Sequence, residues 1–148
     1  MTNTLSLSVQ VDRRDEIDYV LCCLDIDGQP LEECRRYLLA IDLEELFRSE
    51  RESGVFSIIT CWCGVPECAG IRNGVGVRHD AGWVYWRLSS PAPERHYAFR
   101  QADYSQALAD ARRAIKRFVA QRRYSGEGPY ELAAQYANEG YFRLGDEW

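Results

Sequence analysis

The sequence predicts a single α+β domain over residues 1–148, in which an antiparallel β-sheet of about six strands is covered by a long amphipathic helix and by shorter helices. Three patterns predict this class: two long strand patterns at the start of the chain, a series of aromatic and β-branched runs between residues 55 and 99, and a helical apolar stripe over 103–123. With 148 residues, 46% hydrophobic and 28% charged, the chain can fold around one core.

The first two strands are predicted to form a hairpin. Apolar and polar residues alternate from Leu5 to Val11, as in a strand with one buried face. Residues 17–26 have apolar side chains at both odd and even positions, which is typical of a strand covered on both faces. A turn is expected to follow at Asp27 and Gly28.

Two short helices are predicted next. Apolar residues at helical spacing favour a helix that Pro30 opens and that continues through Leu39. A second helix is predicted from Asp42 to Ser49, because Asp42 can cap its N-terminus and Glu45 lies at the reciprocal position of a capping box.

The middle of the chain predicts an antiparallel meander. Its strand-like runs are rich in aromatic and β-branched residues and are separated by turn-forming Gly, Pro, Asn and Asp residues. The four runs are expected to start at Phe56, Val75, Trp83 and Tyr97, and the first to extend to Trp62.

The long helix is predicted to run from Asp103, a suitable N-cap, to Arg123, with one apolar face and one basic face. Pro129 then favours a short helix to about Asn138. The aromatic segment 141–148 is expected to dock on the domain or on another chain.

Charge and composition narrow the classes of partner. The net charge is −5, and residues 1–60 hold thirteen acidic against six basic residues. This excess favours a basic protein partner over nucleic acid, whose phosphates require a dominant positive face. The start of the chain has neither an early positive charge nor an apolar run, so we expect a cytoplasmic protein without membrane partners. The candidate partner-binding residues are Asp12, Asp15, Glu16, Asp18, Glu44 and Glu45.

The cysteines between residues 60 and 70 leave several alternatives open. Cys61, Cys63 and Cys68 could converge on one zinc ion, with His96, His79 or Cys34 as the fourth ligand. We favour the alternative without a cofactor, in which the cysteines pack as small hydrophobic residues, because structural zinc sites usually pair two Cys-x2–4-Cys units. A Cys63–Cys68 disulfide and a cysteine nucleophile beside His79 or His96 are further alternatives.

The segment from Thr60 to Gly70, with its TCxCGxxxCAG-type pattern, resembles a group of small uncharacterised bacterial proteins, as do the runs at Val84 and Tyr97. The similarity spans about residues 17–119 and implies an α+β domain, but no activity. By analogy with other small acidic bacterial proteins, we expect a non-enzymatic protein-binding domain, such as an immunity-like inhibitor of a basic toxin. The alternatives are a zinc-stabilised structural or sensory domain and a small cysteine-dependent enzyme.

Overall fold

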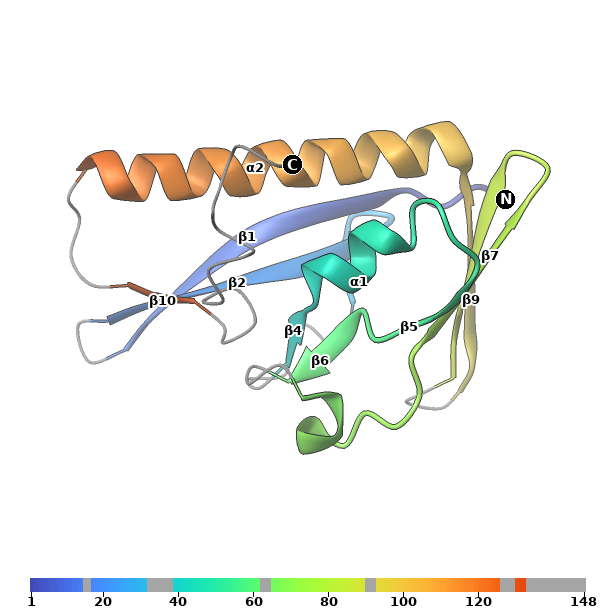
Figure 1. Ribbon diagram of the computed structural model, residues 1–148, viewed down its shortest axis with the longest axis horizontal. Helices are drawn as coiled ribbons and strands as arrows, with labels where there is room; N and C mark the ends of the chain where they lie inside the picture. Colours follow the sequence, from blue (N-terminus) through green and yellow to red (C-terminus); the bar gives the residue numbers. More distant parts are fainter. Residues whose placement is uncertain (15–16, 32–38, 62–64, 90–92, 126–129, 133–148) are drawn as a thin grey trace.

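The structure, a computed structural model, describes residues 1–14, 17–31, 39–61, 65–89, 93–125 and 130–132 (Figure 1). Within these ranges, only the backbone is described for 9–14, 17–21, 39, 69, 118–125 and 130–132. The chain has the predicted α+β class, with antiparallel strands and one long helix. No helix of the described ranges is long and apolar enough to cross a membrane.

The first two strands form the predicted hairpin. β1 (Leu5–Arg14) pairs antiparallel with β2 (Ile17–Ile26), from Leu5 opposite Ile26 to Arg14 opposite Ile17. Asp27 and Gly28 then turn the chain with φ angles of 55° and 76°. This left-handed conformation suits the pair, because glycine has no Cβ and aspartate tolerates it better than most residues.

Two predicted helices are wrong where the structure describes them. Pro30 belongs to β3 (Gln29–Pro30), which returns along β2, and Leu39 opens β4 (Leu39–Ile41). Near the end of the described chain, β10 (Tyr130–Leu132) pairs parallel with β2 where the helix after Pro129 was expected. In these places β-pairing with distant segments outweighs the local helical pattern. Residues 32–38 and 133–148, with the rest of both predicted helices and the aromatic tail, lie outside the described residues.

The capped helix is confirmed. α1 (Leu43–Arg48) begins after Asp42, whose Oδ1 accepts a hydrogen bond from the backbone N–H of Glu45 at 3.1 Å, and Ser49 is its C-cap. Leu43 and Leu46 are fully buried, so this short helix is held by packing as well as by its cap.

The run expected as one strand from Phe56 to Trp62 is divided between two partners. β5 (Gly54–Phe56) pairs with β7 (Val75–Asp80), whereas β6 (Ile59–Cys61) pairs antiparallel with β4. Between them, the backbone N–H of Ser57 donates to the Glu45 carboxylate at 2.9 Å. The single sheet that was expected is therefore separated into several hydrogen-bonded sheets.

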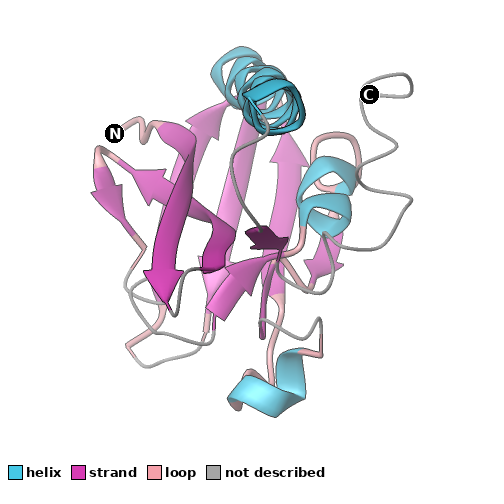
Figure 2. Cartoon of the chain, turned by 90° about the vertical axis from the view of Figure 1, so that its left-hand side faces the viewer, coloured by secondary structure: helices cyan, strands magenta, loops and turns pink. Residues whose placement is uncertain are grey.

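The larger meander forms a four-stranded sheet in the order β5-β7-β8-β9. β7 (Val75–Asp80), β8 (Trp83–Leu88) and β9 (Arg95–Arg100) are antiparallel neighbours. Ala81 and Gly82 connect β7 to β8 with positive φ angles of 47° and 85°, as required by a tight two-residue hairpin turn. The 3-10 helix η2 (Pro66–Ala69) lies at the opposite side of the molecule from the long helix in both ribbon views (Figures 1 and 2).

The covering helix is α2 (Gln101–Ser125), which follows β9 directly and starts two residues before the expected N-cap Asp103. The N–H of Gln101 donates to the carbonyl of Gly82 at 2.8 Å, which ties the helix start to the β7–β8 turn. α2 lies along β1 and also contacts β8 and β9 (Figures 1 and 2). Its buried stripe consists of Tyr104, Leu108, Ala111 and Ile115.

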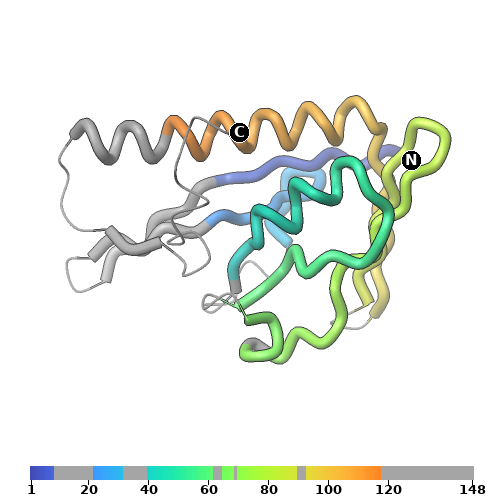
Figure 3. Tube along the Cα trace, in the orientation of Figure 1, coloured from blue at the N-terminus to red at the C-terminus, as the bar shows by residue number. Residues whose placement is uncertain are grey.

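An aromatic cluster joins α2 to the four-stranded sheet. The Trp86 ring meets Phe99 and Tyr104 nearly edge-on, with centroids 5.6 and 6.0 Å apart, and all three side chains are buried. The start of the chain runs beside β9 (Figure 3), where the backbone of Asn3 donates to the Ala98 carbonyl at 2.7 Å. The core therefore fixes the position of the sheet and leaves its other face to solvent.

Candidate functional site

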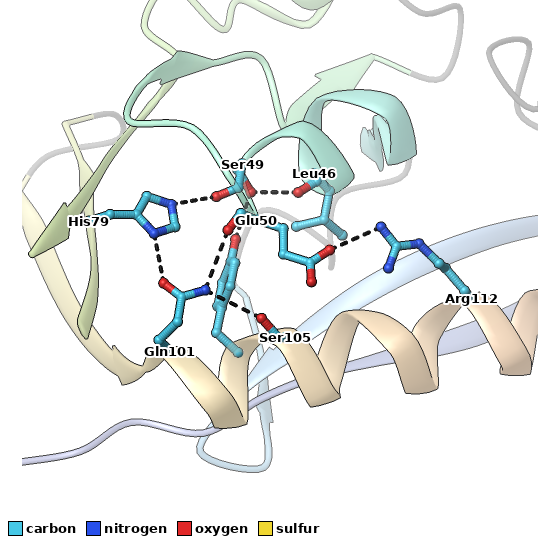
Figure 4. Close-up of polar contacts among 8 residues, drawn as sticks. Leu46, Ser49, Glu50, His79, Gln101, Ser105 and Arg112 are labelled. Atoms are coloured by element: carbon cyan, nitrogen blue, oxygen red, sulfur yellow. Dashed lines mark hydrogen bonds and ion pairs between the residues drawn. The ribbon is translucent and has the colours of Figure 1, made fainter. Parts of the chain in front are cut away.

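A partly buried polar network connects α1, β7 and α2 (Figure 4). The two ring nitrogens of His79 lie 2.8 Å from Gln101 Oε1 and 2.9 Å from the backbone oxygen of Ser49. Gln101 also reaches the carbonyl of Glu50 at 3.4 Å, and the Glu50 carboxylate pairs with Arg112 at 3.1 Å. These contacts tie three elements together at the N-terminal half of α2.

A second series of hydrogen bonds runs deeper in the same region. The indole N–H of Trp86 donates to the Tyr104 hydroxyl at 3.2 Å, which lies 2.7 Å from the Ser49 hydroxyl. Ser49 donates in turn to the backbone oxygen of Leu46 at 2.5 Å, so its own proton is used and Tyr104 is the donor between the two hydroxyls. Burial is the largest cause that raises the pKa of Tyr104, which therefore keeps this proton.

This network has the chemistry of a structural element. His79 contacts the backbone oxygen of Ser49, whereas the Ser49 hydroxyl is fully buried and bonded to Leu46 and Tyr104. A serine nucleophile would need its hydroxyl on the imidazole and open to substrate. The geometry instead holds the end of α1 against α2 and the sheet.

The exposed face of the four-stranded sheet is the second polar region. Along β7, β8 and β9 every second residue is directed away from the core, and paired residues on neighbouring strands form cross-strand rows. We call this surface the arginine face; it consists of Val55, Gly76, Arg78, Asp80, Trp83, Tyr85, Arg87, His96, Ala98 and Arg100.

Arginines and aromatic rings are interleaved on the arginine face. The guanidinium carbon of Arg78 lies 4.4 Å from the centroid of the Tyr85 ring, and that of Arg100 lies 6.0 Å from Trp83. The two rings stack with centroids 6.4 Å apart. Arg78 pairs with Asp80 at 2.6 Å, whereas in the described part of the chain Arg87 and Arg100 form no ion pair. The face is therefore rich in positive charge and in flat apolar surface.

The arginine face is hollowed at Gly76. In this row, Val55, Gly76, Arg87 and His96 lie side by side on four strands, and only glycine lacks a side chain. A cavity of about 510 Å³ opens here. Among its lining residues are Val55, Arg78, Tyr85, Arg87 and His96.

The predicted zinc ligands are only partly described by the structure. Cys61 is buried at the end of β6, Cys68 is exposed on η2, and Cys63 and Cys34 lie outside the described residues. His96 is exposed on β9, and its Nε2 lies 2.7 Å from Glu94. Among the residues that are described, no three His, Cys, Asp or Glu side chains are grouped as metal ligands. Because Cys63 is not among them, the zinc site stays a prediction.

The predicted acidic binding residues are also only partly described. Asp12 and Asp18 lie on β1 and β2, where the backbone alone is described, and Asp15 and Glu16 lie outside the described residues. Glu44 is exposed on α1. Glu45 holds Arg48 at 2.7 Å and the backbone of Ser57, so it contributes to the fold.

The arginine face was not predicted from the sequence. Part of the signal was present, because Val75 and Val77 alternate with Gly76 and Arg78, and Arg87 lies between Trp86 and Leu88. What was missing was the pairing register, which places arginines of different strands on one surface. Comparison with protein-family models, with curated proteins and with solved structures gave no match to this chain.

Proposed function

We propose that this chain is a non-enzymatic protein-binding domain that uses the arginine face to bind an acidic surface of its partner. The observation that carries the proposal is the exposure of Arg87 and Arg100 beside Trp83 and Tyr85. Arg, Trp and Tyr contribute most to the free energy of binding at protein interfaces. A sheet face presents them on a rigid backbone, so the backbone loses little conformational entropy when a partner binds.

Charge favours a protein over a nucleic acid as the partner. The chain carries a net charge of −5, which repels the continuous phosphates of a nucleic acid outside a small local patch. Asp80 lies among the arginines and adds a local negative charge. A protein can place separate carboxylates opposite Arg87 and Arg100 and avoid Asp80, which a regular phosphate backbone cannot do as easily.

This proposal keeps the protein-binding role predicted from the sequence, including an immunity-like inhibitor of a toxin, and changes the surface. The sequence-based alternative uses acidic residues and a basic partner. Of those residues, Glu44 has a described side chain that is exposed on α1. Reversal of charge on the two surfaces therefore separates the alternatives.

The experiment has two stages. A photo-crosslinking amino acid at Tyr85 first identifies the protein held against the arginine face in the source cells, with the same group at Glu67 on η2 as the control. Binding of that purified protein is then measured for Arg87→Glu combined with Arg100→Glu, and for Glu44→Arg. We expect the arginine reversals to weaken binding by at least about 30-fold, as for residues that dominate an interface, and Glu44→Arg to have little effect. The opposite ranking contradicts the proposal and supports the acidic surface.

A further inference from the structure

The hollow at Gly76 is the most specific feature of the arginine face. We infer that it receives the carboxylate of an Asp or Glu side chain of the partner; this inference rests on the proposed function and names the group that is bound. The guanidinium groups of Arg78 and Arg87 give the cavity a positive lining, and His96 also lines it. Val55 and the Tyr85 ring supply apolar contact for the methylene groups of the incoming side chain.

Glycine at position 76 is not required by the fold. Its backbone does not have a positive φ angle, and a Cβ placed there would lie 3.7 Å from the nearest atoms, all of Arg87, which is an ordinary contact. Gly74 differs, because a Cβ there would lie 2.7 Å from the backbone oxygen of Phe56. In the middle of a strand glycine is less favourable than most residues. Because neither the backbone nor the packing requires glycine at position 76, what it contributes is the space that a side chain would fill.

The arginine that borders the hollow is available to a ligand. Arg87 is exposed and, among the described residues, forms no ion pair. Its Nε would lie 3.7 Å from a Cβ placed at Gly76, so the guanidinium is next to the hollow. A guanidinium binds a carboxylate through two parallel N–H donors. A carboxylate above Gly76 would therefore meet Arg87 first, with Arg78 beside it.

His96 already contacts a carboxylate at the rim of the hollow. Its Nε2 lies 2.7 Å from Oε1 of Glu94, and both side chains are largely exposed. The other carboxylate oxygen of Glu94 accepts a weak hydrogen bond from Ser89 at 3.4 Å. Glu94 thus shows the chemistry that suits this position, and it competes with an acidic side chain from outside.

The test uses Gly76→Val, which fills the hollow and suits a strand, with Ala98→Val as the matched control. Ala98 lies on the same face but does not line the cavity. Glutarate represents the acidic side chain, and glutaramide is its uncharged counterpart. Both are titrated against the whole chain while the amide NMR signals of residues 76, 87 and 96 are followed.

We expect saturable shifts with glutarate but not with glutaramide, at least about tenfold weaker binding in Gly76→Val, and unchanged binding in Ala98→Val. A urea unfolding midpoint equal to or above that of the wild type shows that Gly76→Val is folded. Equal glutarate binding by Gly76→Val and the wild type, or no saturable shift in the wild type, overturns the inference.

The inference and the proposed function can fail separately. If the arginine reversals abolish partner binding and Gly76→Val leaves it unchanged, the hollow does not hold the partner's carboxylate, although the face is still the interface. If glutarate binds in the hollow and the arginine reversals do not affect the partner, the hollow binds carboxylates and the proposed interface is wrong.

Discussion

Tyr104 offers the sharpest test of the interior of the molecule. The substitution Tyr104→Phe removes one buried oxygen and keeps the aromatic ring that packs on Phe99 and Trp86. That oxygen accepts from the Trp86 indole at 3.2 Å and donates to the Ser49 hydroxyl at 2.7 Å. In the variant, the Trp86 N–H loses the acceptor that the structure gives it, whereas Ser49 still donates to Leu46.

The cost follows from these two lost contacts. A buried donor without an acceptor destabilises a protein by about 1–3 kcal/mol, and the lost bond to Ser49 adds about 1 kcal/mol. We therefore expect Tyr104→Phe to lower the free energy of unfolding by about 2–4 kcal/mol. For a domain of this size, the melting temperature should fall by roughly 4–16 °C.

Urea unfolding and calorimetry measure this loss, and Tyr97→Phe is the matched control. Tyr97 is half-buried, and within the described part of the chain its hydroxyl makes no hydrogen bond, so its variant should stay within about 0.5 kcal/mol of the wild type. A double-mutant cycle with Ser49→Ala should give a coupling energy of about 0.5–3 kcal/mol. If Tyr104→Phe costs no more than Tyr97→Phe, the hydrogen bonds do not contribute as argued.

Three further variants test other contacts. The backbone N–H of Thr4 donates to Asp27 at 2.8 Å, and the Asn3 amide also donates to it. These hydrogen bonds, the Thr4 bond first, lower the pKa of Asp27 below its ordinary value of 3.8. The ionised carboxylate therefore stabilises the fold above pH 3.8, and this stabilisation is lost as the pH falls through the folded-state pKa. Asp27→Asn should therefore lower the urea midpoint near pH 7, and the difference from the wild type should shrink as the pH falls below 3.8. Arg112→Met leaves the mostly buried Glu50 carboxylate without its ion pair and should cost about 1–2 kcal/mol in urea unfolding. Gly74→Ala should cost about 1–3 kcal/mol in thermal unfolding, since its Cβ would overlap backbone.

Each of these variants has an outcome that contradicts its reasoning. A constant difference between Asp27→Asn and the wild type across the pH range would show that the carboxylate charge is not the cause. Adding Glu50→Gln should recover part of the loss in Arg112→Met, and no recovery would point to packing. Gly76→Val is the control for Gly74→Ala, because a Cβ at position 76 makes only ordinary contacts. If the two variants have the same melting temperature, β5 moves away from the new Cβ at position 74 without a loss of stability.

Local sequence patterns correctly predicted the elements that are stabilised by contacts between residues close together in the chain. The alternation from Leu5 and the apolar run to Ile26 predicted the first hairpin, because the period of two and the turn residues lie in adjacent segments. The cap at Asp42 was predicted for the same reason, since donor and acceptor are three residues apart. The long helix was correct within two residues at both ends.

Predictions failed where a distant partner decides the structure. The apolar spacing after Pro30 suits a helix, yet β2 pairs with this residue and holds it as a strand. Likewise, the run from Phe56 contains nothing that marks a division between β5 and β6. The division arises because β7 and β4 each satisfy the backbone groups of only part of it.

By itself, the sequence determined the α+β class, the N-terminal hairpin, the capped helix and the apolar stripe of α2, because these depend on residue spacing within one segment. Only the tertiary structure decided the arginine face. Arg78, Arg87 and Arg100 lie on three strands, and cross-strand pairing alone places them with Gly76 on one surface. The physical reason is that burial of the opposite face, with Trp86 and the rest of the core, selects one register and directs these charges to solvent.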